Sequence, residues 1–178
     1  MLASLVNIVR TLIRKIQLMG HDPLTIAHYL RRQGAQIGRE CRIYISDLGP
    51  EPYLIRIGDH VTIASGVSLV THDGGCWLFR DQVPDLNCFG KIEIEDNCFI
   101  GINAIILPNV TIGRNSIVGA GSVVTTSIPP GSVAAGVPAR VIATSEDYRM
   151  RRLREWRELD LSKDRRHWKE QLIRHFWK

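Results

Sequence analysis

The chain has 178 residues, of which 44% are hydrophobic and 23% charged, an ordinary composition for one globular domain with its own core. Its formal net charge of +5 is unevenly placed: Lys plus Arg minus Asp plus Glu gives 6 − 2 = +4 for residues 1–40, 6 − 9 = −3 for residues 41–144 and 11 − 7 = +4 for residues 145–178. Because the sequence holds no nucleic-acid motif, a basic balance confined to the ends does not indicate a nucleic-acid partner.

The first forty residues predict two helices. Residues 2–19 form an amphipathic pattern that is too charged to span a bilayer and lacks the apolar region and cleavage site of a signal peptide. Such a helix either packs on its own protein or a neighbouring subunit, or lies on an anionic membrane surface. A second helix is expected from Asp22 to Arg32, with Asp22 as N-cap, Pro23 in its first turn and Gly34 beyond its end.

From residue 37 onward, apolar residues tend to recur every six positions, most regularly between residues 94 and 129. The leading positions of this stretch are Ile94, Ile100, Ile106, Ile112, Val118 and Val124. Neither a helix nor an alternating strand keeps these residues in line. The period predicts a coil of short strands in which three hexapeptides close one triangular turn and the leading residues stack inside, about 4.8 Å apart. Small residues such as Gly101, Gly113 and Gly119 follow at the corners, where a Cβ would crowd the bend.

Two interruptions precede the regular repeats. The earlier leading residues are Ile37, Ile43, Ile57, Ile63 and Leu69, and the period is lost over residues 47–53. Leu69 and Ile94 are separated by 25 positions, one more than a multiple of six, so the repeat cannot run through this region. Residues 72–91 contain no repeat and predict an excursion loop, the kind of segment on which a rigid scaffold tends to carry its chemistry.

The last part of the chain is expected to leave the coil. Pro129, Pro130 and Pro138 are predicted to end it, and residues 145–178 to form helices. Arginines crowd the first of these helices, at Arg149, Arg151, Arg152, Arg154 and Arg157. This run is a solvated face, a membrane-facing patch or a contact for a polyanionic ligand or partner. The predicted divisions are a helical segment over 1–36, the coil over 37–143 with its excursion loop over about 72–91, and a basic helical segment over 144–178.

The stretch from residue 100 to residue 142, IGINAIILPNVTIGRNSIVGAGSVVTTSIPPGSVAAGVPARVI, resembles the hexapeptide-repeat acyltransferases, which include galactoside, maltose and xenobiotic acetyltransferases. Over residues 37–143 the resemblance implies a mainly β fold, a left-handed parallel β-helix, flanked here by N-terminal and C-terminal α-helices. It also implies a homotrimer with active sites between subunits. The order Thr71-His72-Asp73-Gly74-Gly75, with Trp77, is similar to that of acetyltransferases from surface-polysaccharide gene clusters.

One of the six histidines, His72, stands where the coil breaks into the loop. A neutral imidazole near pH 7 can take a proton from a hydroxyl or an amine, although the residues alone leave a structural role open. The resemblance implies that His72 is the general base that deprotonates the acceptor as it attacks the thioester of acetyl-CoA. Transfer is then direct, without an acyl-enzyme, and backbone N–H groups hold the oxyanion.

The resemblance also places coenzyme A along the outside of the coil, between two subunits. Matched motif by motif, its contacts fall on Ile102, Ala120, Thr125, Thr126 and Arg140. The family commonly has a lysine at the position of Thr126 and a basic residue at that of Ala143. Because both positive charges are missing here, Arg140 is expected to hold the 3′-phosphate together with an arginine of the basic tail, such as Arg149.

The acceptor site is less specific in the sequence. Polar or aromatic candidates near the loop and the early irregular segment are Asp73, Trp77, Asp85, Glu51 and Tyr44. An aromatic face beside carboxylates suits a sugar, but each residue could equally be part of the loop structure. No metal is expected, because His60 and His72 have no third coil histidine and the four cysteines, read as buried free thiols, lack zinc-site spacing.

Together with these observations, the resemblance implies an acetyl-CoA-dependent acetyltransferase that modifies a sugar hydroxyl, or less favourably an amine, in cell-surface polysaccharide biosynthesis. The expected location is the cytoplasm, with peripheral contact at the inner membrane face through the basic ends as an open alternative. Two other functions remain open: a xenobiotic acetyltransferase acting on an antibiotic, and a non-catalytic β-helix that binds or scaffolds partners.

Overall fold

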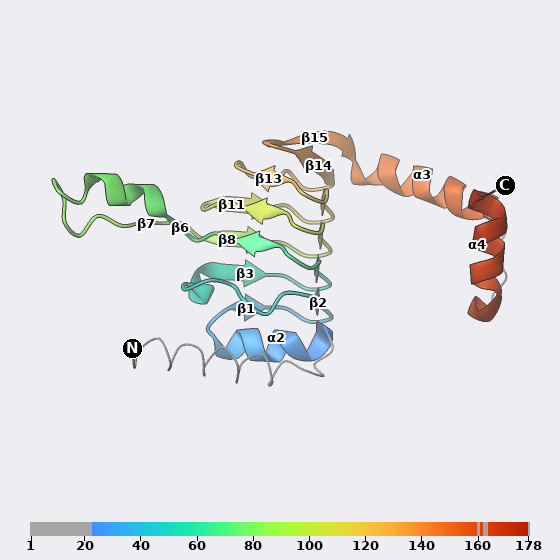
Figure 1. Cartoon of the computed structure of the whole chain (residues 1–178), viewed down its shortest axis with the longest axis horizontal. Coiled ribbons are helices and arrows are strands. Elements are labelled where there is room, and N and C mark those ends of the chain that lie inside the picture. The colour runs from blue at the N-terminus through green and yellow to red at the C-terminus, as the bar shows by residue number, and fades with distance from the viewer. Residues whose placement is uncertain (1–22, 160, 162–163, 178) are drawn as a thin grey trace.

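The protein was analysed as a computed structural model that describes residues 23–159, 161 and 164–177. The described chain winds into a parallel β-helix with helices at both of its ends, and one loop projects sideways from the coil (Figure 1). The helix predicted over residues 2–19 and the N-cap Asp22 lie outside the described residues.

Strands of two to six residues form the three faces of the coil. The first face contains β1 (Gln36–Ile37), β3 (Ile55–Ile57), β8 (Ile92–Ile94) and β11 (Val110–Ile112). The second face contains β2 (Arg42–Ile43), β4 (Thr62–Ile63), β9 (Phe99–Ile100), β12 (Ile117–Val118), β14 (Ser132–Gly136) and β15 (Ala139–Thr144). The third face contains β5 (Ser68–Leu69), β10 (Ile105–Ile106) and β13 (Val123–Val124). All pairings within these faces are parallel except that of β14 with β15.

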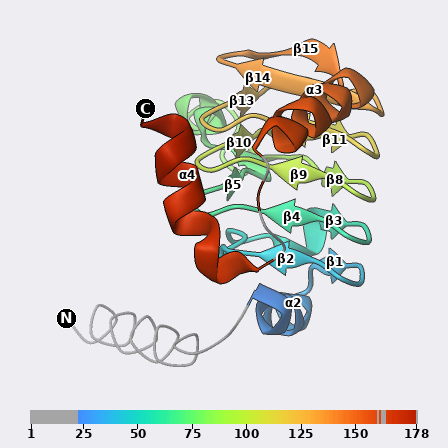
Figure 2. The same ribbon diagram turned by 90° about the vertical axis from the view of Figure 1, so that its right-hand side faces the viewer.

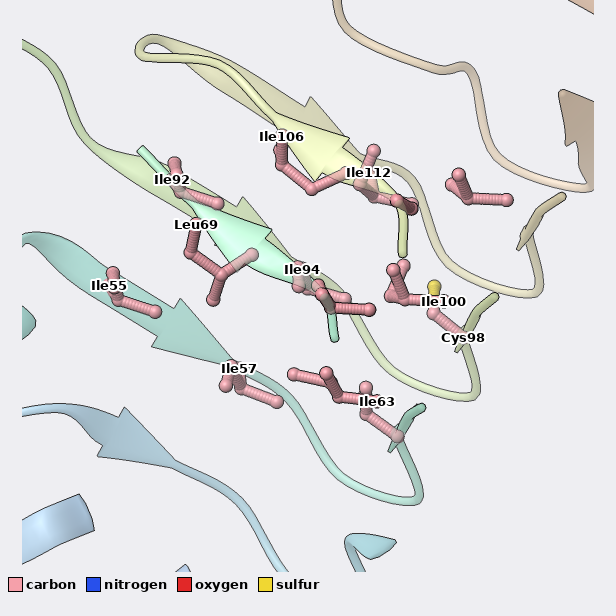
Figure 3. Packing of buried hydrophobic residues seen from close by; sticks show 14 of the residues in the cluster. Ile55, Ile57, Ile63, Leu69, Ile92, Ile94, Cys98, Ile100, Ile106 and Ile112 are labelled. Carbon is pink, nitrogen blue, oxygen red and sulfur yellow. The ribbon is translucent and has the colours of Figure 1, made fainter. Parts of the chain in front are cut away.

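The leading residues of the hexapeptides stack inside the coil, as the sequence predicts. Ile94 lies beside Ile112, and Ile100 lies beside Val118, in neighbouring turns of the coil. Their side chains have no exposed surface, and Figure 3 shows the isoleucines of successive turns pointing into the same interior. A single turn buries little apolar surface, so the stack of turns is what makes a continuous aliphatic core.

The corners use two different residue positions. The predicted crowding at the glycines is confirmed, because a Cβ on Gly101 would lie 2.5 Å from the backbone nitrogen of Ala120. The left-handed backbone conformation, however, occurs at the fourth residue of the hexapeptides. Among the described residues, six that are not glycine adopt it, with φ between +55° and +63°: Glu40, His60, Asn97, Asn103, Asn109 and Asn115. Asn tolerates this conformation better than most residues, so its recurrence at the fourth position is a signal of the corners that the sequence-based prediction missed.

Two of the three prolines predicted to end the coil do not end it. Pro129 and Pro130 do not stop it, because β14 still pairs in parallel with β12 after them, and only then does the chain reverse into β15. The two prolines lie at a corner, next to Gly113 of the turn below, where no ladder N–H is required.

Helices cover one end of the coil and extend from the other (Figures 1 and 2). Helix α2 (Pro23–Arg32) contacts β1 and β2, and Ala27 and Leu30 are buried there. Gly34, with φ of +106°, follows its end as predicted. At the other end are α3 (Ser145–Glu158) and, after the 3-10 turn η3 (Arg165–His167), α4 (Trp168–Phe176). No helix in the described ranges is long and apolar enough to cross a membrane.

Candidate active site

The excursion loop leaves the coil at the corner between the third and the first face. Leu69 and Ile94, which flank this corner, have residue numbers that differ by 25, whereas Ile106 and Ile112, the equivalent pair of the next turn, differ by 6. The strands on either side nevertheless keep their register, since β8 pairs directly with β3. The loop is therefore an insertion that leaves the core unchanged.

A narrow, hydrogen-bonded neck closes the base of the loop. The backbone nitrogen of Gly90 donates to the carbonyl oxygen of Thr71 at 2.8 Å. Just beyond, β6 (His72–Asp73) and β7 (Cys88–Phe89) pair antiparallel, with His72 opposite Phe89. The 3-10 helix η2 (Gly74–Phe79) follows β6. His72 belongs to β6 and thus lies on the neck, and Figure 1 shows β6 and β7 between the coil and the projecting loop.

His72 pairs with a carboxylate that lies far away in the sequence. Its Nδ1 is 3.0 Å from Glu51 Oε2, and Thr71 Oγ1 donates to the same oxygen at 2.6 Å. The side chain of His72 is 44% exposed and that of Glu51 13%, while Thr71 is buried. The Thr71 hydroxyl, and after it the His72 ring, holds the pKa of Glu51 below its ordinary value.

This pair fixes which ring nitrogen of His72 is available. An ionised Glu51 accepts a hydrogen bond, so the neutral ring is assigned its proton on Nδ1. Nε2 then keeps its lone pair and can accept a proton from a bound molecule. The arrangement is a histidine base oriented by a carboxylate, in a position open to solvent.

A hollow of about 390 Å³ lies around His72. Its wall includes two predicted acceptor residues besides Glu51, namely Asp73 and Trp77. Asp73 also has a structural role, because its Oδ1 accepts from the backbone nitrogen of Gly75 at 2.8 Å and caps η2. Trp77 is 71% exposed.

Other residues of this hollow, among them Phe89, Arg80 and Asn87, were not predicted as site residues from the sequence. Phe89 is exposed, and the guanidinium carbon of Arg80 lies 5.5 Å from the centre of the Trp77 ring. Arg80 also donates to the side-chain oxygen of Asn87 and to the Leu86 carbonyl. Arg80 therefore holds together the part of the loop that carries the Trp77 face.

The structure does not bring two predicted acceptor residues to this hollow. Asp85 lies farther along the loop, where its backbone carbonyl accepts from Asn87 Nδ2 at 3.0 Å. Tyr44 is half exposed after β2 on the second face, where its backbone nitrogen donates to Ile63. Nearness in the sequence does not reveal these positions, because Asp85 lies along the loop beyond its neck and Tyr44 lies on the second face of the coil.

The five predicted coenzyme A residues are exposed, and four of them border the third face. Ile102 and Ala120 follow the second face in consecutive turns, and the backbone nitrogen of Gly121 donates to the Ile102 carbonyl at 2.8 Å. Thr125 and Thr126 follow β13, at the same corner as Thr71 but two turns farther along the coil. Arg140 lies on β15, which extends the second face at the end of the coil.

Other possible sites lie away from His72. A larger groove, of about 920 Å³, separates the second face from α3, with Phe99 and Trp156 among its lining residues. Arg149, expected to help bind a phosphate, also lines it and is paired with Glu146, Nη2 to Oε1 at 2.6 Å. Among the described residues, no group of three or more His, Cys, Asp or Glu side chains is arranged to hold a metal. Cys88 is exposed, so the expectation of buried thiols holds only for Cys41, Cys76 and Cys98.

Known proteins share both the repeat and the shape. Residues 91–126 match the bacterial transferase hexapeptide family (six repeats). The chain is 51% identical to protein CapG of Staphylococcus aureus over 122 residues, which are 67% of this chain and 71% of that protein. It is 43% identical to the galactoside O-acetyltransferase of Escherichia coli over 54% of its own length and 47% of the enzyme's. A hexapeptide-repeat acetyltransferase of Vibrio cholerae has the same fold, with a TM-score of 0.59 at 24% identity over 77% of this chain and 89% of that one.

Proposed function

The chain belongs to the hexapeptide-repeat acetyltransferases and is an acyltransferase built on a left-handed parallel β-helix; on this premise we propose that it moves an acetyl group from acetyl-CoA to a sugar hydroxyl in cell-surface polysaccharide biosynthesis. The observation that carries the proposal is the pairing of His72 with Glu51 at the neck of the loop. It provides an oriented base beside an open hollow, which direct acyl transfer requires.

The chemistry follows from the two ring nitrogens of His72. Glu51 holds the Nδ1 proton, and Nε2 takes the proton of the acceptor hydroxyl as its oxygen attacks the thioester carbonyl. Collapse of the tetrahedral centre breaks the carbon–sulfur bond, and the proton on Nε2 passes to the departing thiolate. The ionised Glu51 stabilises the imidazolium that forms between these steps, as the carboxylate of a catalytic triad does.

The donor is proposed to lie along the corners that border the third face. Ile102 and Ala120 offer exposed backbone and small apolar surface to an extended pantetheine arm, and Thr125 and Thr126 offer hydroxyls. The charge for the phosphates is assigned to Arg140. Arg149 can join it only by leaving Glu146, so its contribution to donor binding is expected to be smaller.

A sugar acceptor is supported by the walls of the hollow. Trp77 and Phe89 present exposed aromatic surface on the loop, and Asp73 and Glu51 present carboxylates. One of the relatives acts on a galactoside, as its name states, and we extend a sugar acceptor to this chain on that basis. Because the chain spans less than half of that enzyme's length, the particular sugar is left to experiment.

A homotrimer is part of the proposal. Several large apolar side chains of the loop are exposed, at Trp77, Leu78, Phe79, Val83 and Phe89. Five large apolar side chains exposed on one loop suit a contact with another protein surface, so a neighbouring subunit is the proposed cover. The hollow would then be completed between subunits. Sedimentation velocity at micromolar concentration tests this, and a monomeric protein would refute it.

The central experiment measures thiol release from acetyl-CoA with an array of sugars, sugar nucleotides and lipid-linked sugars. His72→Ala should lower kcat by about 10²-fold to 10⁴-fold, the range of general-base catalysis. His60→Asn is the matched control, because His60 is also a coil histidine but lies on another corner and lines a different groove. Equal rates for wild type and His72→Ala, with a competent acceptor, would overturn the proposal.

The same assay separates the rival functions. Turnover of an antibiotic with none on any sugar would identify a xenobiotic acetyltransferase. Absence of turnover on every acceptor, with a stable partner complex in its place, would identify a binding or scaffold protein.

A further inference from the structure

Helix α4 has an inner and an outer side. Its inner side is half-buried: Trp168 and Leu172 belong to it, and the ring of Trp168 meets that of Trp156 in α3 edge to face, with centroids 5.7 Å apart. Residues four and three positions apart share one side of a helix, so Lys169, Ile173 and Phe176 lie together on another side. These three residues and Trp177, which follows the helix, are called the outer stripe.

The outer stripe is well exposed. Ile173 is 50% exposed, Phe176 64% and Trp177 83%. In Figure 1 the helix hangs at one extremity of the molecule and the excursion loop projects at the other. An apolar stripe at such a position requires a cover, and the cover does not obstruct the hollow around His72.

The charge around the stripe is positive. Residues 164–177 contain Arg165, Arg166, Lys169 and Arg174 against Asp164 and Glu170, which gives 4 − 2 = +2 with both histidines neutral, and Asp164 pairs with Arg166. Within the described part of the chain, Lys169 and Arg174 make no ion pair. The complement of this surface is therefore an anionic one.

The position of Lys169 favours a lipid surface over a protein surface as the contact of the outer stripe. It shares its side of the helix with Ile173 and Phe176, and lysine is depleted from the cores of protein interfaces. At a membrane surface the same side chain lays its apolar stem beside the acyl boundary and keeps its ammonium among the headgroups. Tryptophan and phenylalanine beside basic residues are typical of helices that lie in this boundary region.

We infer that the outer stripe of α4 docks on the anionic surface of a phospholipid membrane. The contact is shallow: one short helix inserts Ile173, Phe176 and Trp177, while Lys169 and Arg174 meet the headgroups. This membrane contact is separate from acetyl transfer, since it determines the location of the enzyme and not the reaction that it catalyses. A single short helix binds weakly, so several copies in one assembly would strengthen the attachment.

The test is co-sedimentation of the full chain with vesicles of phosphatidylcholine alone or mixed with phosphatidylglycerol, at low and high salt. The wild type should pellet only with the anionic vesicles and should be released by salt. The double variant Phe176→Glu with Trp177→Glu should bind about tenfold or more weakly, because it loses apolar insertion and adds repulsion. Tyr53→Glu is the matched control, an aromatic residue of equal exposure, 64%, near the other end of the coil, and should bind like wild type.

Three outcomes would overturn the inference. The first is wild-type protein that stays in the supernatant with anionic vesicles at low salt. The second is a double variant that pellets as well as wild type, which would assign the binding to another part of the chain. The third is a double variant whose sedimentation velocity shows a smaller assembly than wild type, which would make the stripe a contact between copies. Circular dichroism and a thermal melt of the double variant confirm that it is folded before it is compared.

Discussion

His60 and His72 lie at two corners of the same coil and show what the excursion changes. His60 is in the left-handed conformation of a regular corner, and its Nδ1 lies 2.8 Å from Asn97 Oδ1 in the next turn. Asn97 Nδ2 in turn donates to Asn115 Oδ1, one turn farther along the coil. His72 is on a strand of the neck, and its Nδ1 meets the Glu51 carboxylate. At the regular corner, side chains at equivalent positions of successive turns are hydrogen-bonded to one another. At the interrupted corner, a histidine ring faces a carboxylate instead.

The first prediction concerns a substitution that destabilises the regular region of the coil. Ile100→Ala should lower the free energy of unfolding by roughly 3 kcal/mol, because Ile100 has no exposed surface and its loss leaves a cavity in the stack. Phe99→Ala, one residue away, should cost under about 1 kcal/mol, because that side chain points outward and is 43% exposed. Urea unfolding followed by circular dichroism measures both. Similar costs for the two would mean that the alternation in β9 is not what supports the core.

The second prediction concerns a substitution at the interrupted corner, outside the hydrophobic core. Glu51→Gln keeps the shape but removes the charge that orients and stabilises the His72 ring, so kcat should fall about 100-fold with little change in KM. Glu93→Gln is the control, a paired carboxylate that Lys91 and Arg56 contact on the first face. A comparable loss of activity in both variants would contradict a special role for Glu51.

The third prediction concerns the left-handed backbone conformation at a regular corner. Asn97→Ala places an alanine in the left-handed conformation, whereas Asn97→Gly removes the same side chain without that strain. The alanine variant should therefore be less stable than the glycine variant by about 1 kcal/mol. Denaturant midpoints decide the order, and an alanine variant as stable as the glycine variant would show that the side-chain ladder alone holds the corner.

The fourth and smallest effect concerns pH. The folded-state pKa of Glu51 is lowered by Thr71 and then by His72, so the ionised carboxylate stabilises the fold above the ordinary carboxyl pKa. That contribution is lost as the pH falls through the lowered pKa. Unfolding curves of wild type and Glu51→Gln should therefore differ at neutral pH and converge in acid. A difference that grows in acid would show the opposite sign.

Much of the fold was predictable because it repeats. The six-residue spacing of Ile94, Ile100 and Ile106 is enough to predict the stack, and the prediction that the chain is a coil of hexapeptides is confirmed. The prediction that Pro129 and Pro130 help to end the coil was wrong, since both prolines lie at a corner. Proline is a stop signal for a strand but not for a bend between strands, and the sequence pattern does not distinguish these positions.

The site was predictable only in part. His72 is conspicuous in the sequence because it stands where the period fails. Glu51 was expected near the acceptor, and its pairing with His72 was missed because the first two turns are offset by 20 residues, as in the pairing of Ile37 with Ile57. The residue 20 positions before Thr71 is Glu51, and the Thr71 hydroxyl donates a hydrogen bond to Glu51. A search for equal offsets across an irregular turn would have found the partner.

The closed neck has a consequence for how such a protein can diversify. Gly90 and Thr71 are joined by a backbone hydrogen bond, and β3 and β8 pair as though nothing lay between them. The segment beyond the neck is therefore an exchangeable part: it can lengthen, shorten or be replaced from a relative while the scaffold stays as it is. Under the proposed function, exchange of this one segment changes the acceptor preference and leaves the proposed donor surface of the coil intact.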